Sequence, residues 1–208
     1  ANLTIENTAG PIGQAVALAL SADRVLLENC NILGNQDTLY TSGEGFKQYL
    51  KNCFIEGTTD FIFGNATVVF EKCTIHSKSN SFITAASTPQ GIGFGYVFLN
   101  CILTADQQAT EVYLGRPWRT FAKTVFIECH MGNHILPIGW DNWSNTEAEK
   151  KSFYGEYNCD GPGYQPTSRV AWSHQLTKLQ VKKYTLNNIL AEKNPSLPTH
   201  WYLDSKID

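Results

Sequence analysis

Charged residues are scarce in this sequence: they make up 17% of its 208 residues, against a usual share of about a quarter. The 16 Lys and Arg and the 19 Asp and Glu give a formal net charge of -3 at pH 7. Because no long basic stripe is available to bind phosphates, nucleic acid is not an expected partner.

Long apolar runs are also missing. The longest candidate near the start, residues 15–20, is far shorter than the roughly 18 residues that a membrane helix requires, so we expect no membrane partner. The first residue is Ala1, and no charged-then-apolar leader follows it. We therefore expect any export signal to have been removed or to lie outside this sequence.

What the sequence does contain is a short pattern repeated along the chain. The copies are VLLENCNI (25–32), QYLKNCFI (48–55), VVFEKCTI (68–75), YVFLNCIL (96–103) and TVFIECHM (124–131). Each copy has a run of Val, Ile, Leu and Phe, then a polar residue, a Cys and a second alternating segment, which is typical of strand, corner, strand. One such unit cannot bury its apolar face alone, and steps of 20 to 28 residues between the cysteines are typical of a stacked solenoid. We predict an all-β fold, a parallel β-helix.

The repeated cysteines predict an internal ladder of small apolar side chains. No C-x2-C or His-rich spacing accompanies them, so no metal site is expected. Equivalent Cα atoms on neighbouring coils lie about 4.8 Å apart, within the range of a disulfide, which allows a bridge between Cys53 and Cys73. Cys159 lies outside the pattern, and we expect it to be free.

The pattern changes after about residue 144. We expect one domain, residues 1–208, with coils to about residue 144 and a tail, residues 145–208, that packs along the coils or caps them. Within the tail, short helical turns are indicated by Thr177 and Gln180 and by the spacing of Leu176, Leu179 and Tyr184.

The repeat also brings two aspartates together. Asp37 lies seven residues after Cys30, and Asp60 lies seven residues after Cys53. Two like charges stacked about 5 Å apart repel by roughly 3 kcal/mol at an effective dielectric near 20, enough to separate their proton affinities by about two pKa units. Such pairs serve acid–base or nucleophilic chemistry, while a calcium site or an inexact register remain alternatives.

Three further segments carry polar groups suited to such a site: GPIGQAVAL with Gln14, GNQDTLY with Gln36, and YLGRPWR with Arg116 and Trp118. A Gln amide can donate a hydrogen bond to a developing oxyanion. An Arg side chain can hold one carboxylate ionised through a bidentate contact.

Four segments, taken in order, resemble the signature segments of the pectin methylesterases. They are NTAGPIGQAVAL (7–18), GNQDTLY (34–40), EGTTDFIFGNA (56–66) and YLGRPWR (113–119). The resemblance implies a right-handed, single-stranded parallel β-helix. It also implies hydrolysis of the methyl esters of pectin (methylated polygalacturonate), with release of methanol and without a metal or organic cofactor.

The resemblance also implies roles for the residues at the site. Asp60 is the expected nucleophile, and Arg116 supports its ionisation. Asp37 is expected first to protonate the departing methanol and then to activate the water that clears the acyl-enzyme. Gln14 and Gln36 are expected to bind the oxyanion.

Substrate contacts are expected from Trp118, stacked on a galacturonate ring, and from Phe63. Arg119 and Lys123 are expected to join Arg116 as local positive charge near the groove. One departure is Thr59, where the family usually has Val before the nucleophile, which adds a hydroxyl to the strand.

The family's earlier coils, including its G-x-Y-x-E segment, are absent from this chain, and we expect a monomer when the full helix is present. The substrate lies in plant cell walls, so a secreted or periplasmic location is expected. Alternatives to the esterase are another β-helix polysaccharide enzyme, a pectate lyase or polygalacturonase, and a carbohydrate-binding solenoid without turnover.

Overall fold

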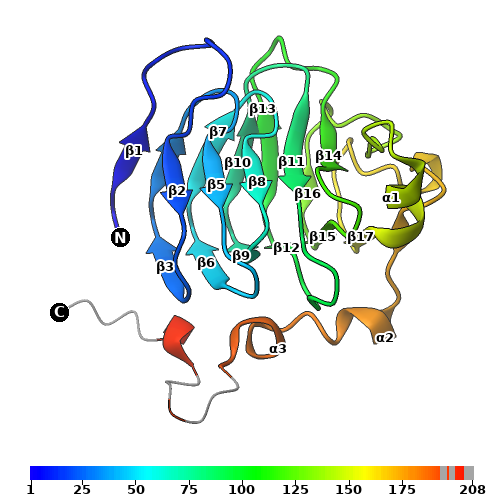
Figure 1. Ribbon diagram of the computed structural model, residues 1–208. Helices are drawn as coiled ribbons and strands as arrows, with labels where there is room; N and C mark the ends of the chain where they lie inside the picture. Colours follow the sequence, from blue (N-terminus) through cyan, green and yellow to red (C-terminus); the bar gives the residue numbers. More distant parts are fainter. Residues whose placement is uncertain (193–195, 197–199, 204–208) are drawn as a thin grey trace.

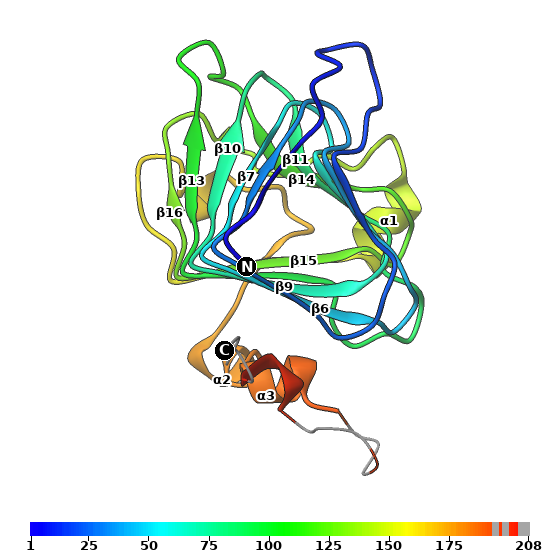
Figure 2. The same ribbon diagram turned by 90° about the vertical axis from the view of Figure 1, so that its left-hand side faces the viewer.

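The computed structural model describes residues 1–192, 196 and 200–203. Its strands form parallel sheets wound into a right-handed β-helix, which confirms the predicted fold class (Figure 1). Viewed along the helix axis, three sheets enclose a common interior (Figure 2). We call them sheets 1, 2 and 3 in the order in which the chain first visits them.

Each coil adds short strands to these sheets. Sheet 1 contains β1 (Thr4–Glu6), β4 (Asn31–Leu33), β7 (Phe54–Gly57), β10 (Thr74–Ser77), β13 (Ile102–Ala105) and β16 (His130–Met131). Sheet 2 contains β2 (Leu18–Leu20), β5 (Leu39–Thr41), β8 (Ile62–Gly64), β11 (Phe82–Ala86) and β14 (Tyr113–Pro117). Sheet 3 contains β3 (Val25–Glu28), β6 (Lys47–Lys51), β9 (Thr67–Glu71), β12 (Tyr96–Leu99), β15 (Lys123–Ile127), β17 (Phe153–Tyr157) and β18 (His174–Gln175).

The corner between sheets 3 and 1 is made the same way in successive coils. The residue before each cysteine has a left-handed backbone, with φ between 47° and 54°: Asn29, Asn52, Lys72, Asn100, Glu128 and Asn158. Asparagine tolerates this conformation better than most residues, which explains why it recurs there. The N–H at the corner still bonds to the next coil, as Asn52 does to Glu71 O at 3.0 Å. The chain therefore turns without losing its ladder of hydrogen bonds.

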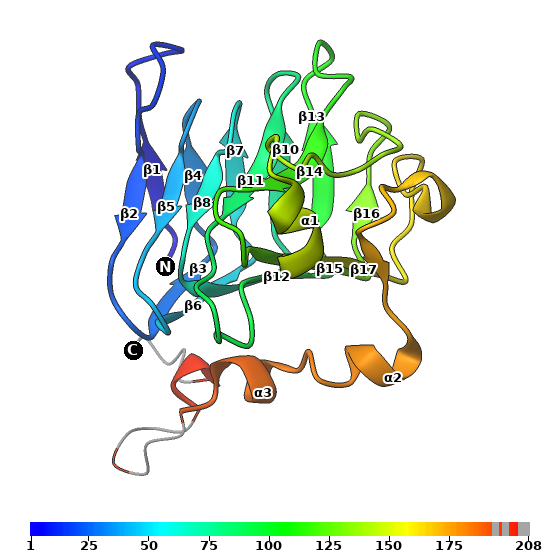
Figure 3. The same ribbon diagram turned by 45° about the vertical axis from the view of Figure 1, so that its right-hand side comes forward.

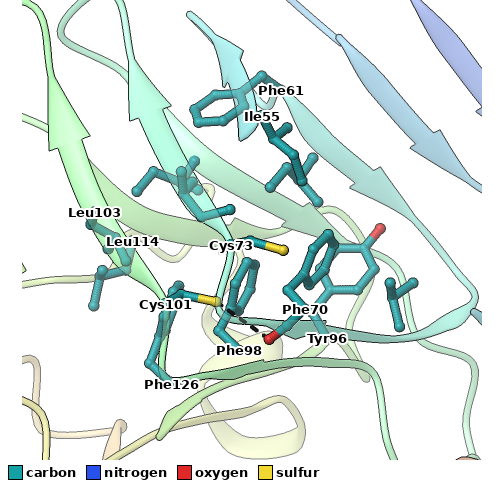
Figure 4. Packing of buried hydrophobic residues seen from close by; sticks show 14 of the residues in the cluster. Ile55, Phe61, Phe70, Cys73, Tyr96, Phe98, Cys101, Leu103, Leu114 and Phe126 are labelled. Atoms are coloured by element: carbon teal, nitrogen blue, oxygen red, sulfur yellow. Dashed lines mark hydrogen bonds between the residues drawn. The ribbon is translucent and has the colours of Figure 1, made fainter. Parts of the chain in front are cut away.

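The interior is filled by stacks of like side chains. Phe70, Phe98 and Phe126 stack with ring centroids 4.5 and 4.3 Å apart, beside Cys73 and Cys101 (Figure 4). Stacked aromatic pairs add about 0.5–1.5 kcal/mol each beyond the burial of their area. The apolar ladder that the sequence predicts is thus present.

The predicted bridge between Cys53 and Cys73 is wrong, because all six cysteines of the described chain are free thiols. Each of these two Sγ atoms instead donates to backbone carbonyls, as Cys73 Sγ does to Leu50 O at 3.5 Å. Cys159 is free, as expected, but it belongs to the ladder. Its Sγ donates to the carbonyl two residues earlier, Tyr157 O, as the other ladder cysteines do to theirs.

The coil stack continues beyond residue 144, where the sequence pattern predicted its end. A short helix, α1 (Thr146–Lys151), interrupts the chain, and β17 then pairs with β15. β17 has the sequence FYGEY, without the Val, Ile and Leu of the earlier copies, and this hides the next repeat in the sequence.

The last part of the chain packs along sheet 3, one of the two arrangements expected for the tail. It contains α2 (Lys178–Val181), α3 (Leu186–Leu190) and η2 (Trp201–Leu203) (Figure 3), whereas η1 (Pro166–Ser168) comes earlier in the chain, before β18. Leu176 and Tyr184 are buried against the outer face of sheet 3, but Leu179 is 76% exposed, contrary to the expected apolar spacing. The predicted helical turn at Thr177 is confirmed by a capping box with Gln180. Among the described helices, none has the length and apolar character to cross a membrane.

Candidate active site

The two aspartates occupy equivalent positions on adjacent coils. The pairing offset is the same before them, Ile32 with Ile55, and after them, Leu39 with Ile62. Asp37 and Asp60 are both left-handed, with φ of 61° and 49°, and form the corner between sheets 1 and 2. They are 8% and 6% exposed. The structure therefore stacks the two carboxylates as the repeat predicts.

The surroundings affect the two carboxyl groups differently. Burial, and then the nearby charge of Asp60, raise the pKa of Asp37 to about 6, while the charge of Arg116 acts against this rise. Burial raises the pKa of Asp60 as well, and that pKa stays above its ordinary value although hydrogen bonds and charge from Arg116 oppose the rise. Asp60 is thus held by a cation, whereas Asp37 is placed to carry a proton.

Arg116 reaches Asp60 from β14. Its Nε donates to Asp60 Oδ1 at 3.0 Å, and its Nη2 donates to Oδ2 at 2.7 Å. The guanidinium also lies between two aromatic rings. Its Cζ is 3.9 Å from the centroid of Phe82 and 3.7 Å from that of Trp143.

The remaining predicted site residues complete the walls of one pocket. Gln14 and Gln36 pair with each other through a parallel backbone bridge, at the edge of the pocket beside the aspartates. The rings of Phe63 and Trp118, with centroids 6.0 Å apart, also line this pocket.

This pocket has a volume of about 370 Å³. Its lining includes all seven residues that the sequence analysis assigned to catalysis and substrate binding: Gln14, Gln36, Asp37, Asp60, Phe63, Arg116 and Trp118. Stacked carboxylates, amide groups and aromatic rings around one hollow can support acyl transfer on a sugar ester.

The expected cluster of positive charge at the groove is only partly formed. Arg119 lines a neighbouring hollow of about 290 Å³, which shares Trp118 and Trp143 with the first. Lys123 lines neither of these hollows, because its Nζ donates to Ile92 O at 2.6 Å. Burial, and then the charge of Lys183, lower the pKa of Lys123. The expectation for Lys123 is therefore wrong.

Comparison with known proteins identifies the family of the chain. A family model described as Pectinesterase matches residues 1–193. The chain belongs to the pectinesterase family.

Relatives in this family include Pectinesterase 31 from Arabidopsis thaliana, which is 48% identical over 177 residues. That alignment covers 84% of this chain and 55% of the relative. Putative pectinesterase 11 from the same plant is 38% identical, with 92% of this chain and 54% of the relative covered. The chain thus spans between a third and just over half of the length of these curated relatives and others.

Solved structures agree with the family assignment. A pectin methylesterase from carrot superposes with a TM-score of 0.84 at 34% identity, covering 90% of this chain and 63% of that one. A pectin methylesterase in complex with a hexasaccharide superposes with a TM-score of 0.76 at 29% identity, covering 94% of this chain and 70% of that one.

The departure from the pectinesterase pattern at Thr59 is accommodated by the next coil. Ser81 Oγ donates a hydrogen bond to Thr59 Oγ1 at 2.8 Å. Thr59 O accepts from the N–H of Asp37 at 3.0 Å, so the residue still supports the corner that holds the two aspartates. The added hydroxyl therefore has a partner.

Sequence reasoning missed Phe82 and Trp143. Their contacts with Arg116 join segments far apart in the chain, so no local pattern shows them. One signal was available: Trp143 lies among residues suited to tight turns, in DNWSN (141–145).

Proposed function

We propose that this chain carries the active site of a pectin methylesterase, which hydrolyses methyl esters of polygalacturonate and releases methanol. The observation that carries the proposal is the unequal aspartate pair. Asp60 is bound in bidentate fashion by Arg116, and the pKa of Asp37 is raised to about 6. One carboxylate is thus suited to attack, and the other carboxyl group is suited to donate a proton.

In the first half of the reaction, a carboxylate oxygen of Asp60 attacks the ester carbonyl carbon. The carbonyl oxygen becomes an oxyanion, which the side-chain amides of Gln14 and Gln36 stabilise by donating hydrogen bonds. The bond to the methoxy oxygen then breaks as Asp37 gives that oxygen its proton. Methanol leaves, and an acyl-enzyme anhydride on Asp60 remains.

In the second half, the ionised Asp37 takes a proton from a water molecule. The resulting hydroxide attacks the acyl carbon, and Asp60 departs as a carboxylate that Arg116 again binds. The product is a galacturonate carboxyl group, and Asp37 has regained its proton. The cycle needs no oxidant or other reactant than water.

Substrate binding is assigned to Trp118 and Phe63, whose rings form one wall of the pocket. Indole and phenyl faces pack well on the apolar faces of sugar rings. We further propose a secreted or periplasmic enzyme, because a cell-wall polymer is reached only outside the cytoplasm. We also propose that it works as a monomer when the full helix is present. Sedimentation of the purified protein tests the monomer, and fractionation of the source cells tests the location.

The test is methanol release from highly methylated pectin with a chelator present, for the parent and for Asp60→Asn. We expect release by the parent and a loss of about 10⁴-fold or more in the variant, as for other covalent nucleophiles. Asp106→Asn is the matched control, since that carboxylate pairs with His76 outside the pocket and its loss should leave turnover unchanged. A folded parent that binds pectin without releasing methanol would contradict the proposal.

A further inference from the structure

The environment of Arg116 contains a feature that the reaction itself does not require. Its guanidinium lies between the rings of Phe82 and Trp143, with ring centroids 3.9 and 3.7 Å from Cζ. A guanidinium held on both faces cannot tilt out of its plane, while its edge stays free for the two oxygens of Asp60.

The two rings reach Arg116 in different ways. Phe82 lies on β11 beside β14, where it is paired in register with Tyr113 and stacks on that ring at 4.9 Å. It is not among the residues lining the pocket. The backbone carbonyl of Phe82 accepts a hydrogen bond from the N–H of Asp60 at 2.8 Å, which a change of side chain leaves in place. The ring of Phe82 reaches the site through its contact with Arg116.

Trp143 is held in place by a strained backbone. Its φ is 54° and that of Ser144 is 55°, a conformation that bulky residues rarely adopt. Backbone strain of this kind persists where the surrounding structure enforces it, and it is frequent at functional sites.

The contacts that enforce this conformation fix the segment at both ends. The N–H of Trp143 donates to Asp141 Oδ1 at 2.6 Å, and Asp141 is anchored by its own N–H to Gly115 O on β14. On the other side, Asn142 Nδ2 donates to Glu149 Oε1 on α1 at 2.6 Å. The indole, 37% exposed, is thereby held over the guanidinium on the solvent side.

From this geometry we propose that Phe82 and Trp143 are positioning residues, an aromatic clamp that fixes Arg116 against Asp60. This inference rests on the proposed function, because the role of Arg116 does. The clamp restricts the guanidinium to the one orientation that binds both Asp60 oxygens. It also keeps water from the ion pair, which strengthens that pair.

Kinetics separate this role from substrate stacking. Phe82→Leu and Trp143→Leu are each expected to lower kcat about tenfold, the range of cation–π contacts, with KM changed by less than about threefold. Trp143→Phe, which restores a ring, is expected to recover activity to within about threefold of the parent. Phe54→Leu is the matched control, since Phe54 stacks on His76 on sheet 1 and its loss should change neither constant.

A double-mutant cycle tests whether the effect passes through Arg116. In an Arg116→Lys background, Phe82→Leu should lower kcat by less than about twofold, because an ammonium group has no plane for the clamp to hold. A full tenfold loss in that background would overturn the proposal. A rise in KM with unchanged kcat in Trp143→Leu would also overturn it, since that result indicates a substrate contact alone.

A second measurement does not depend on turnover. In the parent, ring currents from both faces should shift the Nε–H proton signal of Arg116 upfield in a nuclear magnetic resonance spectrum. The signal should move downfield in Phe82→Leu and in Trp143→Leu, but not in Phe54→Leu. An unshifted signal in the parent would refute the clamp, whereas a shifted signal in a parent without methanol release would refute only the proposed function.

Discussion

Two stacks of like side chains in this molecule arise from the same winding of the chain, but one contains thiols and the other carboxylates. The cysteine ladder lies at the corner between sheets 3 and 1, and the pair of Asp37 and Asp60 lies at the corner between sheets 1 and 2. In both, the winding of the chain places residues of one type directly above each other. Left-handed residues make the turn in both.

The difference lies in what stacking does to each side chain. A thiol gains dispersion contacts from a like neighbour and gives its weak hydrogen bond to a carbonyl, as Cys101 does to Phe70 O at 3.3 Å. A carboxylate beside another carboxylate gains repulsion, which adds to the effect of burial in raising the pKa of Asp37. The cysteine stack therefore contributes to the stability of the fold, whereas the aspartate stack has the altered proton affinity that the proposed reaction uses.

The largest effect that separates the two stacks is expected from Asp37→Asn. Removal of the proton donor should lower kcat by about 10²–10⁴-fold, the usual contribution of general acid–base catalysis. In the parent, kcat/KM should fall as pH rises through about 6, because Asp37 then loses the proton that methanol requires. Pectin methylesterase assays over a pH series check both points, and an unaltered alkaline limb in the variant would show that another group titrates.

The same substitution should have the opposite effect on stability. The pKa of Asp37 is about 6 in the folded protein against an ordinary 3.8, so the folded state binds the proton more tightly. The free energy of unfolding must then fall as pH rises from about 4 to about 6. Above that range, Asp37→Asn should be more stable than the parent by about 1–2 kcal/mol, less than the full shift implies because the carboxyl borders an open pocket.

Urea unfolding at several pH values measures this gain. Glu111→Gln, at an exposed position, controls for the general loss of one negative charge. A gain that does not grow between pH 4 and pH 7 would show that the proton affinity of Asp37 is ordinary in the folded protein.

A substitution in the cysteine ladder should lower stability and leave activity nearly unchanged, the reverse of what is expected for Asp37→Asn. Cys101→Ala removes one buried sulfur and leaves a small cavity, so the free energy of unfolding should fall by about 1 kcal/mol. Methanol release should stay within about twofold of the parent, since the ladder has no contact with the pocket. Loss of activity without loss of stability would contradict this division between the stacks.

The sequence predicted those parts of the molecule that depend on spacing alone. Equal offsets from Cys30 and Cys53 identified the aspartate stack, since register in a coil is a property of chain length. Contacts between coils were harder: Trp143 meets Arg116 only because an unusual backbone turn directs it there. The predicted position of Lys123 at the groove was wrong, because distance along the sequence does not show on which face of the β-helix a side chain lies.

Cys159 shows a different limit. It has the same left-handed corner as the other repeats, and Asn158 precedes it as an Asn precedes three of them. The strand before it, FYGEY (Phe153–Tyr157), has no Val, Ile or Leu, unlike the other copies, and this disguises the repeat. The exposure of Leu179, between the buried Leu176 and Tyr184, also depends on a structural detail that the spacing of the three residues does not show. α2 spans only Lys178–Val181, and sheet 3 covers residues on either side of it.

The smallest expected effect comes from Thr59→Val, which restores the usual residue of the family next to Asp60. Loss of the hydrogen bond from Ser81 should lower the free energy of unfolding by about 0.5–1 kcal/mol, while Val keeps the shape of the strand. Activity should remain within about twofold, because Asp37 bonds to the backbone carbonyl of this residue, not to its side chain. If the hydroxyl pair acts as described, Ser81→Ala should have a similar effect, and the double variant should lose no more than either alone. Additive losses, measured by urea unfolding, would show that the two hydroxyls stabilise the coil independently.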